Sequence, residues 1–146
     1  MTARETQRTA ATYLSRYKTA LAECRDIERR IQSARNDMMG VRGISYENGD
    51  MPKAPSVTGD LSDYMVRLDA LVREWQSARD RALDLMLEIT SAINAVEHDQ
   101  ARRVLMLHFV DGHSYEDIAE RIPCGINSVY RWRRIGLMQI HVGSKW

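Results

Sequence analysis

Two long stretches of this chain carry apolar or small residues at alternating steps of three and four, which is the spacing of a coiled-coil helix. The first seam consists of Leu14, Tyr17, Leu21, Cys24, Ile27, Ile31, Ala34 and Met38. The second seam consists of Leu61, Met65, Leu68, Val72, Trp75, Ala78, Ala82, Leu85, Ile89, Ala92 and Val96. Two long amphipathic helices are therefore predicted.

Each seam also contains one extra step of three, and the two irregular steps coincide if the helices fold back on each other. Pairs such as Cys24 with Trp75 and Leu14 with Leu85 have residue numbers that sum to 99, as antiparallel pairing in one register requires. An extra step of three interrupts the heptad repeat and overwinds a coiled-coil helix. Because the two irregular steps would lie beside each other in the hairpin, both helices could overwind at the same level. We therefore predict an antiparallel hairpin within residues 1–97. Pairing of the seams between chains, or a generic helical bundle, is the alternative.

Residues 40–60 separate the two seams and are predicted to form a long loop. They contain several glycines and prolines and show no sustained hydrophobic period. Asp60 stands directly before the second seam, where an aspartate is a favourable N-cap. We therefore expect the second long helix to begin after Asp60.

The segment from Ser114 to Arg134, SYEDIAERIPCGINSVYRWRR, predicts two short helices that cross at a tight turn. Ser114 is a good N-cap, and the methyl side chain of Ala119 is small enough for the second helix to approach closely. Apolar residues follow helical spacing on both helices. The residues predicted to pack are Ile118, Ala119, Ile122, Val129 and Trp132. This pattern is typical of a helix-turn-helix.

The remaining side chains of the second helix have the chemistry of DNA recognition. Arginine can bind guanine with two hydrogen bonds, asparagine can bind adenine, and serine can bind base edges or phosphate. From residue 126 to the end of the chain every charged residue is basic. The candidate DNA-binding residues are Asn127, Ser128, Tyr130, Arg131, Arg133, Arg134, Ser114, Tyr115 and Lys145.

The segment from Arg102 to Arg134, RRVLMLHFVDGHSYEDIAERIPCGINSVYRWRR, resembles the C-terminal promoter-reading domain of bacterial sigma factors. The shared order is a leucine-rich helix, a turn with glycine, and Ser-Tyr-Glu-Asp-Ile-Ala. The run SVYRWRRIGL is similar to phage late-gene transcriptional activators of the RinA and ArpU type. This resemblance implies action at promoters of packaging and structural genes, with host RNA polymerase, in the bacterial cytoplasm.

One residue departs from the usual helix-turn-helix pattern. Pro123 stands where such motifs usually have glycine, and proline cannot adopt the left-handed conformation that glycine supplies. We expect the turn to be rebuilt around Pro123, Cys124 and Gly125, which leaves the start of the second helix open by about a residue or two.

A third helix is expected just before the helix-turn-helix, because two short helices alone bury too little surface to stay folded. Its apolar residues are Ala101, Val104, Leu105, Leu107 and Phe109. Asp99 is placed to cap this helix and Gly112 to end it. The predicted fold class is all-α, with an antiparallel, coiled-coil-like hairpin over residues 1–97 and a three-helix helix-turn-helix domain over residues 98–146.

Charge and composition narrow the function classes. The net charge is only +1, with 14 basic and 15 acidic residues through Glu97, then 7 and 5 afterwards. A protein with so little net positive charge is expected to make few contacts with DNA phosphates and to bind DNA with modest affinity as a monomer. Formation of a homodimer, or binding to RNA polymerase, would help to hold it on double-stranded DNA. The two cysteines and four histidines are not spaced as metal ligands are. The sequence also contains no catalytic motif and no apolar run long enough to cross a membrane. We therefore expect no enzyme activity, no cofactor, no metal and no membrane association.

Two other functions remain open. A phage small terminase subunit also joins a helix-turn-helix to long oligomerising helices and binds packaging-site DNA as a ring. Alternatively, the helix-turn-helix is a protein-binding module that contacts polymerase or a regulator without reading DNA. Oligomer size distinguishes the first from promoter control, and salt-dependent DNA binding distinguishes the second.

Overall fold

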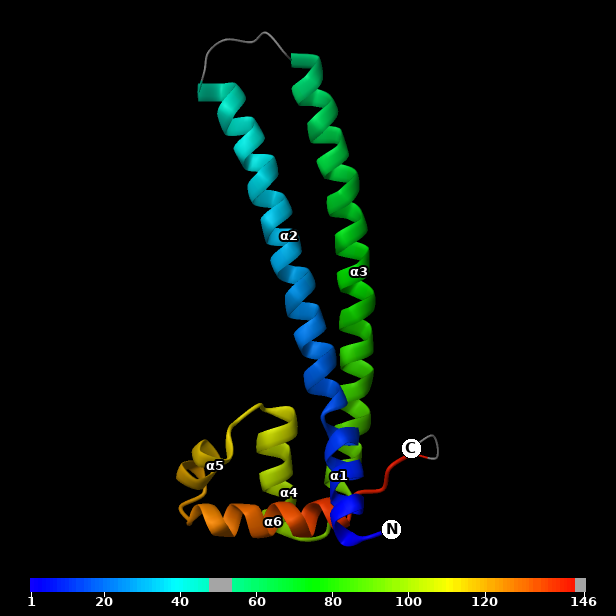
Figure 1. Ribbon diagram of the computed structural model, residues 1–146, viewed down its shortest axis with the longest axis vertical. Helices are drawn as coiled ribbons and strands as arrows, with labels where there is room; N and C mark the ends of the chain where they lie inside the picture. The colour runs from blue at the N-terminus through cyan, green and yellow to red at the C-terminus, as the bar shows by residue number, and fades with distance from the viewer. Residues whose placement is uncertain (48–53, 144–146) are drawn as a thin grey trace. The chain divides into compact units, whose positions relative to one another are not determined.

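The computed structural model describes the backbone of residues 1–47 and 54–143, and the side chains of residues 1–39 and 61–143. The described residues form helices and no strands, so the predicted all-α class is confirmed (Figure 1). The elements are α1 (Ala3–Leu14), α2 (Arg16–Glu47), α3 (Ala54–Asn94), α4 (Asp99–Leu105), a π-helical segment η1 (Met106–Val110), α5 (Tyr115–Arg121) and α6 (Ile126–Met138).

The chain divides into two compact units. The hairpin unit consists of residues Leu21–Asp80, and the terminal unit combines Met1–Ala20 with Arg81–Trp146. This division does not follow the predicted boundary between residues 97 and 98. That boundary separates domains expected to fold independently, and it stays a prediction. The two units are described separately below.

In the hairpin unit, α2 and α3 run antiparallel beside each other (Figure 1). Cys24, Ile27 and Ile31 of α2 and Ala78 of α3 are buried, as their places in the seams predict. Trp75 donates a hydrogen bond from Nε1 to a carboxylate oxygen of Glu28 at 3.0 Å, which links the two helices at their polar edge. The hairpin is thus formed within one chain.

One member of the predicted seams does not lie at the helix interface. Met65 is 47% exposed, whereas every other seam residue is buried or half-buried. The step from Leu61 to Met65 to Leu68 has the correct spacing, so periodicity alone could not identify the exception.

The predicted loop over residues 40–60 is wrong at both ends. Helix α2 continues to Glu47, and α3 begins at Ala54, so residues 40–47 and 54–60 are helical. An isolated glycine inside a helix costs only about 1 kcal/mol relative to alanine, so Gly40 and Gly43 do not end α2. What lies between the two helices is outside the described residues.

The predicted start of the second long helix is corrected for a related reason. Asp60 lies inside α3 and is not its N-cap. Pro55 is the second residue of α3, and a proline is tolerated in the first turn because the N–H it lacks has no partner there. The glycines and prolines that suggested a loop are therefore compatible with helix at these positions.

The first long helix is interrupted at Ser15, which the seam did not predict. Helix α1 begins with a capping box, in which Thr2 and Glu5 each accept a backbone N–H of the other. At Ser15, the hydroxyl group donates to the carbonyl oxygen of Ala11 at 2.7 Å, a contact that bends helices. The chain then continues as α2 from Arg16.

Helix α1 packs with the C-terminal helices in the core of the terminal unit. The Tyr13 hydroxyl group donates to Glu88 at 2.9 Å, and Arg16 forms an ion pair with the same carboxylate at 3.1 Å. The buried residues of this core are Ala10, Tyr13, Leu14, Ile89, Ile93, Val96, Ala101, Leu105, Phe109, Leu137 and Ile140. Because the core includes residues of α1 and α3, the C-terminal helices depend on the chain's first helix for burial.

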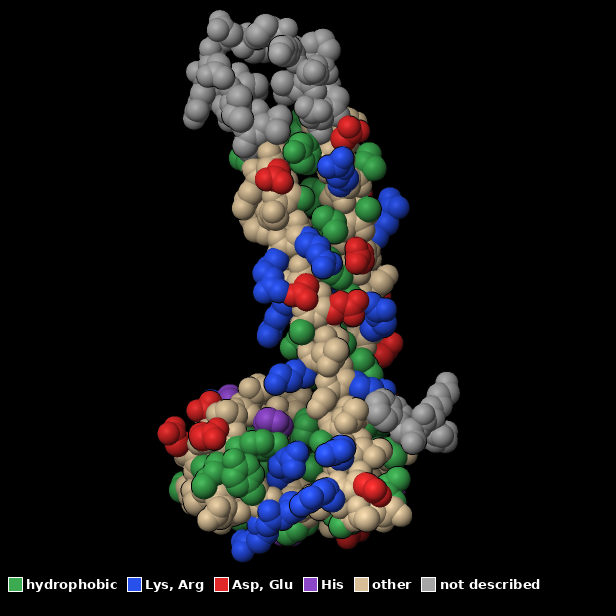
Figure 2. Space-filling model, in the orientation of Figure 1, with side chains coloured by type: hydrophobic (Ala, Val, Ile, Leu, Met, Phe, Trp, Pro, Cys, Tyr) green, Lys and Arg blue, Asp and Glu red, His purple; other side chains and the backbone are tan. Residues whose placement is uncertain are grey.

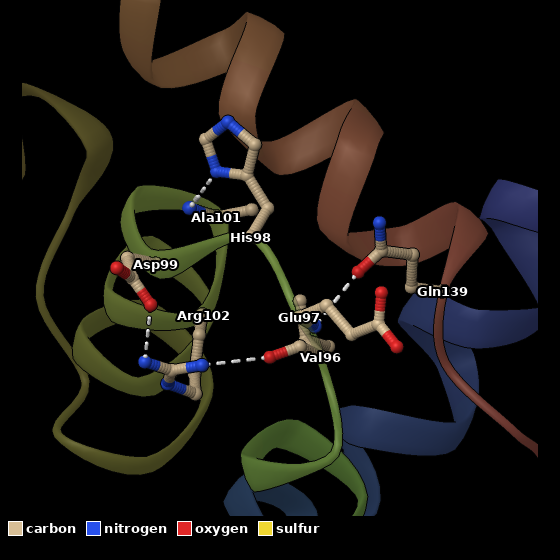
Figure 3. Close-up of polar contacts among 7 residues, drawn as sticks. All are labelled: Val96, Glu97, His98, Asp99, Ala101, Arg102 and Gln139. Atoms are coloured by element: carbon tan, nitrogen blue, oxygen red, sulfur yellow. Dashed lines mark hydrogen bonds and ion pairs between the residues drawn. The ribbon is translucent and has the colours of Figure 1, made fainter.

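A set of polar contacts joins the end of α3, the start of α4 and the end of α6 (Figure 3). His98 is the N-cap of α4, because its Nδ1 accepts the Ala101 N–H at 3.1 Å. The predicted cap, Asp99, is instead the first residue of the helix, where its carboxylate pairs with Arg102 at 2.7 Å. The same guanidinium group donates to the carbonyl oxygen of Val96 at 2.8 Å.

The loop between α3 and α4 is also held against the end of α6. The backbone N–H of Glu97 donates to the side-chain oxygen of Gln139 at 3.0 Å, and Gln139 is the C-cap of α6 (Figure 3). This contact holds the residue just before the N-cap of α4 against the end of α6.

Candidate nucleic-acid interface

A wide turn after α4 sets the entry to the helix-turn-helix. The helix continues through η1, where the Asp111 N–H reaches the carbonyl oxygen of Met106 at 3.1 Å. Gly112 then has φ +80°, a conformation that glycine adopts without steric penalty, so its predicted role as the helix end is confirmed. The His113 N–H closes the turn on the carbonyl oxygen of Leu107 at 2.9 Å.

Helix α5 begins where its sequence predicts and ends just before Ile122. The Ser114 hydroxyl oxygen accepts the Asp117 N–H at 3.2 Å, which confirms the predicted N-cap. The helix ends at Arg121 because Ile122 precedes a proline, and a residue before proline is driven to extended backbone. Ile122 has φ −104° and ψ 102°.

The turn around Pro123 resolves the start of the second helix. Gly125 has φ −77° and ψ 153°, so it is an extended N-cap rather than a left-handed turn residue. Helix α6 accordingly begins at Ile126. A left-handed glycine is not needed at this turn, and Pro123 can therefore replace the usual residue.

The five residues predicted to pack the helix-turn-helix all contribute to one apolar cluster. Val104 of α4 is buried there with Ile118, Ile122 and Val129. Ala119 and Trp132 are half-buried and pack against the same cluster. The cluster holds α5 and α6 together with α4, which confirms the predicted three-helix core.

A close approach that the sequence interpretation missed lies further along α6, at Gly136. A Cβ atom placed on Gly136 would lie 2.7 Å from Cδ1 of Leu105 and 3.4 Å from Cβ of Ala101. The backbone of α6 therefore packs directly against these two side chains of α4, with no room for a side chain at residue 136. The available signal was a glycine inside a helical pattern, which is disfavoured unless packing requires it.

The packing leaves one side of α6 uncovered. Asn127, Tyr130, Arg131 and Arg134 are exposed, and the exposed fraction of the large Tyr130 side chain is 37%. Since a helix turns by 3.6 residues, these positions lie on the side away from Val129. Helix α6 carries no acidic residue, and Figure 2 shows Lys and Arg side chains over α6, with acidic side chains over α5.

Tyr115 and Arg133, also predicted as DNA-binding residues, bind each other. The Arg133 Nε atom donates to the Tyr115 hydroxyl oxygen at 2.6 Å, and the guanidinium carbon lies 5.6 Å from the ring centroid. The Tyr115 ring stacks on His108, with the ring centroids 4.1 Å apart. Burial raises the pKa of Tyr115, and the nearby Arg133 charge opposes that rise. Tyr115 therefore acts here by orienting Arg133.

The remaining predicted site residues are placed as follows. Ser114 uses its hydroxyl group to cap α5, and Ser128 is half-buried near the start of α6. Lys145 lies outside the described residues. Cys24 is buried and Cys124 is half-buried, and the two do not form a disulfide bond.

Within residues 1–39 and 61–143, no group of three His, Cys, Asp or Glu side chains is arranged to hold a metal ion. In the same part of the chain, no helix is both long enough and apolar enough to cross a membrane.

Comparison with known families assigns the C-terminal region. Residues 88–140 match the family described as Sigma-70, region 4. The match begins within the last two turns of α3 and includes all of α4, α5 and α6. No curated protein and no solved structure matches the chain. Residues 88–140 are therefore similar to Sigma-70 region 4, a helix-turn-helix domain, and the predicted resemblance of this segment to sigma factors is confirmed.

Proposed function

We propose that this protein is a sequence-specific DNA-binding regulator of phage or prophage late genes that acts together with host RNA polymerase in the bacterial cytoplasm. The observation that supports it best is the uncovered side of α6, where Asn127, Tyr130, Arg131 and Arg134 project from a Sigma-70 region 4 domain.

The proposed roles follow from the chemistry of these side chains. A recognition helix enters the major groove with its N-terminal residues closest to the base edges. Asn127 and Arg131 lie in the first two turns of α6, so they are the proposed base-reading residues, for adenine and guanine respectively. Arg134 lies one turn further on and is proposed to contact a phosphate group.

The phage context rests on a narrower observation. The run SVYRWRRIGL, from Ser128 to Leu137, is similar to activators of the RinA and ArpU type. The partnership with polymerase is proposed because Sigma-70 region 4 domains contact polymerase as well as DNA. The modest charge of this chain, +1 overall, also favours a partner that holds it on the promoter.

A selection of bound duplexes from a random DNA library tests the proposal. We expect one preferred sequence, and Arg131→Ala should reduce the free energy of binding to it by about 1–3 kcal/mol. Arg30→Ala is the matched control, because Arg30 is an exposed arginine on α2 in the hairpin unit. Absence of any sequence preference, or equal affinities for Arg131→Ala and the control, would contradict the proposal.

The two alternatives give different results in the same experiments. A small terminase subunit would form a large ring in light scattering, whereas promoter control needs only a monomer or dimer. Binding to DNA through phosphate groups weakens steeply as the salt concentration rises, and a protein-binding module would lack such binding. If DNA binding is found, footprinting on the late region of the cognate phage would identify the promoter.

A further inference from the structure

Helix α1 brings two more arginines beside α6. Arg4 and Arg8 are exposed and lie one turn apart, so they share one face of α1. The opposite face carries Ala10, Tyr13 and Leu14, which are buried in the core of the terminal unit. The packing of α1 in this core therefore fixes the side of the helix on which the two arginines lie.

These arginines line a pocket with Arg133 of α6. The pocket has a volume of about 420 Å³ and is lined by Arg4, Gln7, Arg8, Ala11, Thr12, Ser15 and Arg133. Its lining contains three guanidinium groups and no carboxylate. Arginine presents several N–H groups in a planar fork that matches the oxygens of a phosphate group. The pocket thus has the chemistry of an anion site.

No ion pair within the described residues neutralises Arg4 or Arg8. By contrast, Arg16 and Arg102 of the same unit pair with carboxylates at 3.1 Å and 2.7 Å. The acidic residue of α1, Glu5, instead binds the backbone N–H of Thr2. Three like charges around one pocket repel each other until an anion enters.

Arg133 is already oriented for such a contact. Its Nε atom is held by the Tyr115 hydroxyl group at 2.6 Å, which limits the conformations of the side chain. In the described part of the chain, the terminal nitrogens of this guanidinium group make no other hydrogen bond. Part of the entropy of ordering Arg133 is therefore lost before an anion binds.

We propose that this pocket binds a backbone phosphate of the same DNA duplex whose major groove α6 enters, which rests on the function proposed above. The major groove is only about 12 Å wide, so elements packed beside a recognition helix meet the phosphates at its edge. Lys and Arg side chains continue from α6 onto α1 on the face shown in Figure 2.

The test removes the two arginines of α1 together. Arg4→Ala/Arg8→Ala leaves the buried face of α1 unchanged, and alanine is the best helix former, so the fold should persist. The control is Arg30→Ala/Arg35→Ala, which removes two exposed arginines of α2 and the same charge. Circular dichroism and urea unfolding of both variants check that the fold is retained.

DNA affinity is then measured across a salt series for the wild type, the double variant and the control. Each lost phosphate contact should reduce the slope of log K against log salt by about 0.9, and should lower affinity about tenfold near 0.1 M salt. We expect this change for Arg4→Ala/Arg8→Ala alone. The loss should be the same for every DNA sequence, because phosphate contacts carry no base information.

The possible failures can be told apart. If the wild type binds DNA through Arg131 but the α1 variant keeps the wild-type slope, the pocket proposal is wrong and the proposed function stands. If the wild type binds no DNA, both fail. Titration with inorganic phosphate supplies the third arm. Saturation that depends on Arg4 and Arg8, together with an unchanged DNA slope, would assign the pocket to a free anion and overturn the proposal.

Discussion

Substitution of Gly136 by alanine tests whether α6 is held against α4 by close backbone contact. The added methyl group would lie 2.7 Å from Cδ1 and 3.0 Å from Cγ of Leu105. Leu105 is fully buried in the core of the terminal unit, so a shift of its side chain must be accommodated by neighbouring core residues. The helices must separate, or the leucine must leave its preferred rotamer.

Two opposing terms set the size of the effect. Alanine favours the helix over glycine by about 1 kcal/mol. Overpacking a filled core costs about 1–3 kcal/mol. The overlap should win, so Gly136→Ala should lower the free energy of unfolding by up to about 2 kcal/mol.

A double-mutant cycle with Leu105→Ala separates the two terms. Leu105→Ala alone should cost about 2–5 kcal/mol because it leaves a cavity. In that background the overlap is gone, so Gly136→Ala should become stabilising by about 1 kcal/mol. Urea denaturation of the four proteins measures this change of sign, and Gly143→Ala is the control because its added methyl group would contact nothing within 4 Å. Equal stabilisation by Gly136→Ala in both backgrounds would refute the close contact.

Three further predictions concern the entry to the helix-turn-helix and its aromatic stack. Gly112→Ala should lower the free energy of unfolding by about 1–2 kcal/mol in urea denaturation, because φ is +80° there; an unchanged midpoint would contradict this. Tyr115→Phe removes the oxygen that accepts from Arg133 and should lower unfolding free energy by about 1 kcal/mol, so a difference from wild type below about 0.3 kcal/mol would show that this bond is not stabilising. Burial lowers the pKa of His108 from 6.5, and the charges of Lys18 and Arg133 add to this, although a hydrogen bond with the His113 carbonyl opposes it. His108 therefore binds a proton more tightly in the unfolded state than in the folded state. The neutral His108 side chain contributes fully to stability above about pH 6.5, and this contribution is lost as the pH falls toward the lower pKa of the folded protein. The melting temperature of the wild type should therefore drop more between pH 7.5 and 5.5 than that of His108→Phe, and equal drops would exclude His108 as the cause.

Local signals in the sequence were sufficient for much of the fold. The period of the two seams identified the helices of the hairpin, because one buried stripe requires apolar residues at steps of three and four. Ser114 and Gly112 act through local hydrogen bonds and backbone conformation, so their roles could be predicted without knowledge of the tertiary structure. The glycines near residue 40 misled the prediction, since one unfavourable residue rarely ends a long helix.

The candidate site was predictable in part. The uncovered side of α6 follows from the positions of Val129 and Trp132, because burial of one helical stripe determines which side chains remain exposed. The contact between Tyr115 and Arg133 was not predictable, since it joins residues 18 positions apart on two helices. The same holds for the pocket beneath Arg4 and Arg8, more than a hundred residues from Arg133 in the chain.

The sequence by itself determined the helical class, the two seams and the helix-turn-helix, because each depends on residues within a few turns of one another. Only the tertiary structure decided that α1 packs with the C-terminal helices and that Gly136 meets Leu105. These contacts join segments that are distant along the chain, and many apolar stripes are chemically able to cover one another. Which pair does so depends on shape, which no local pattern encodes, and on the bend at Ser15, a local contact that the hydrophobic period does not reveal.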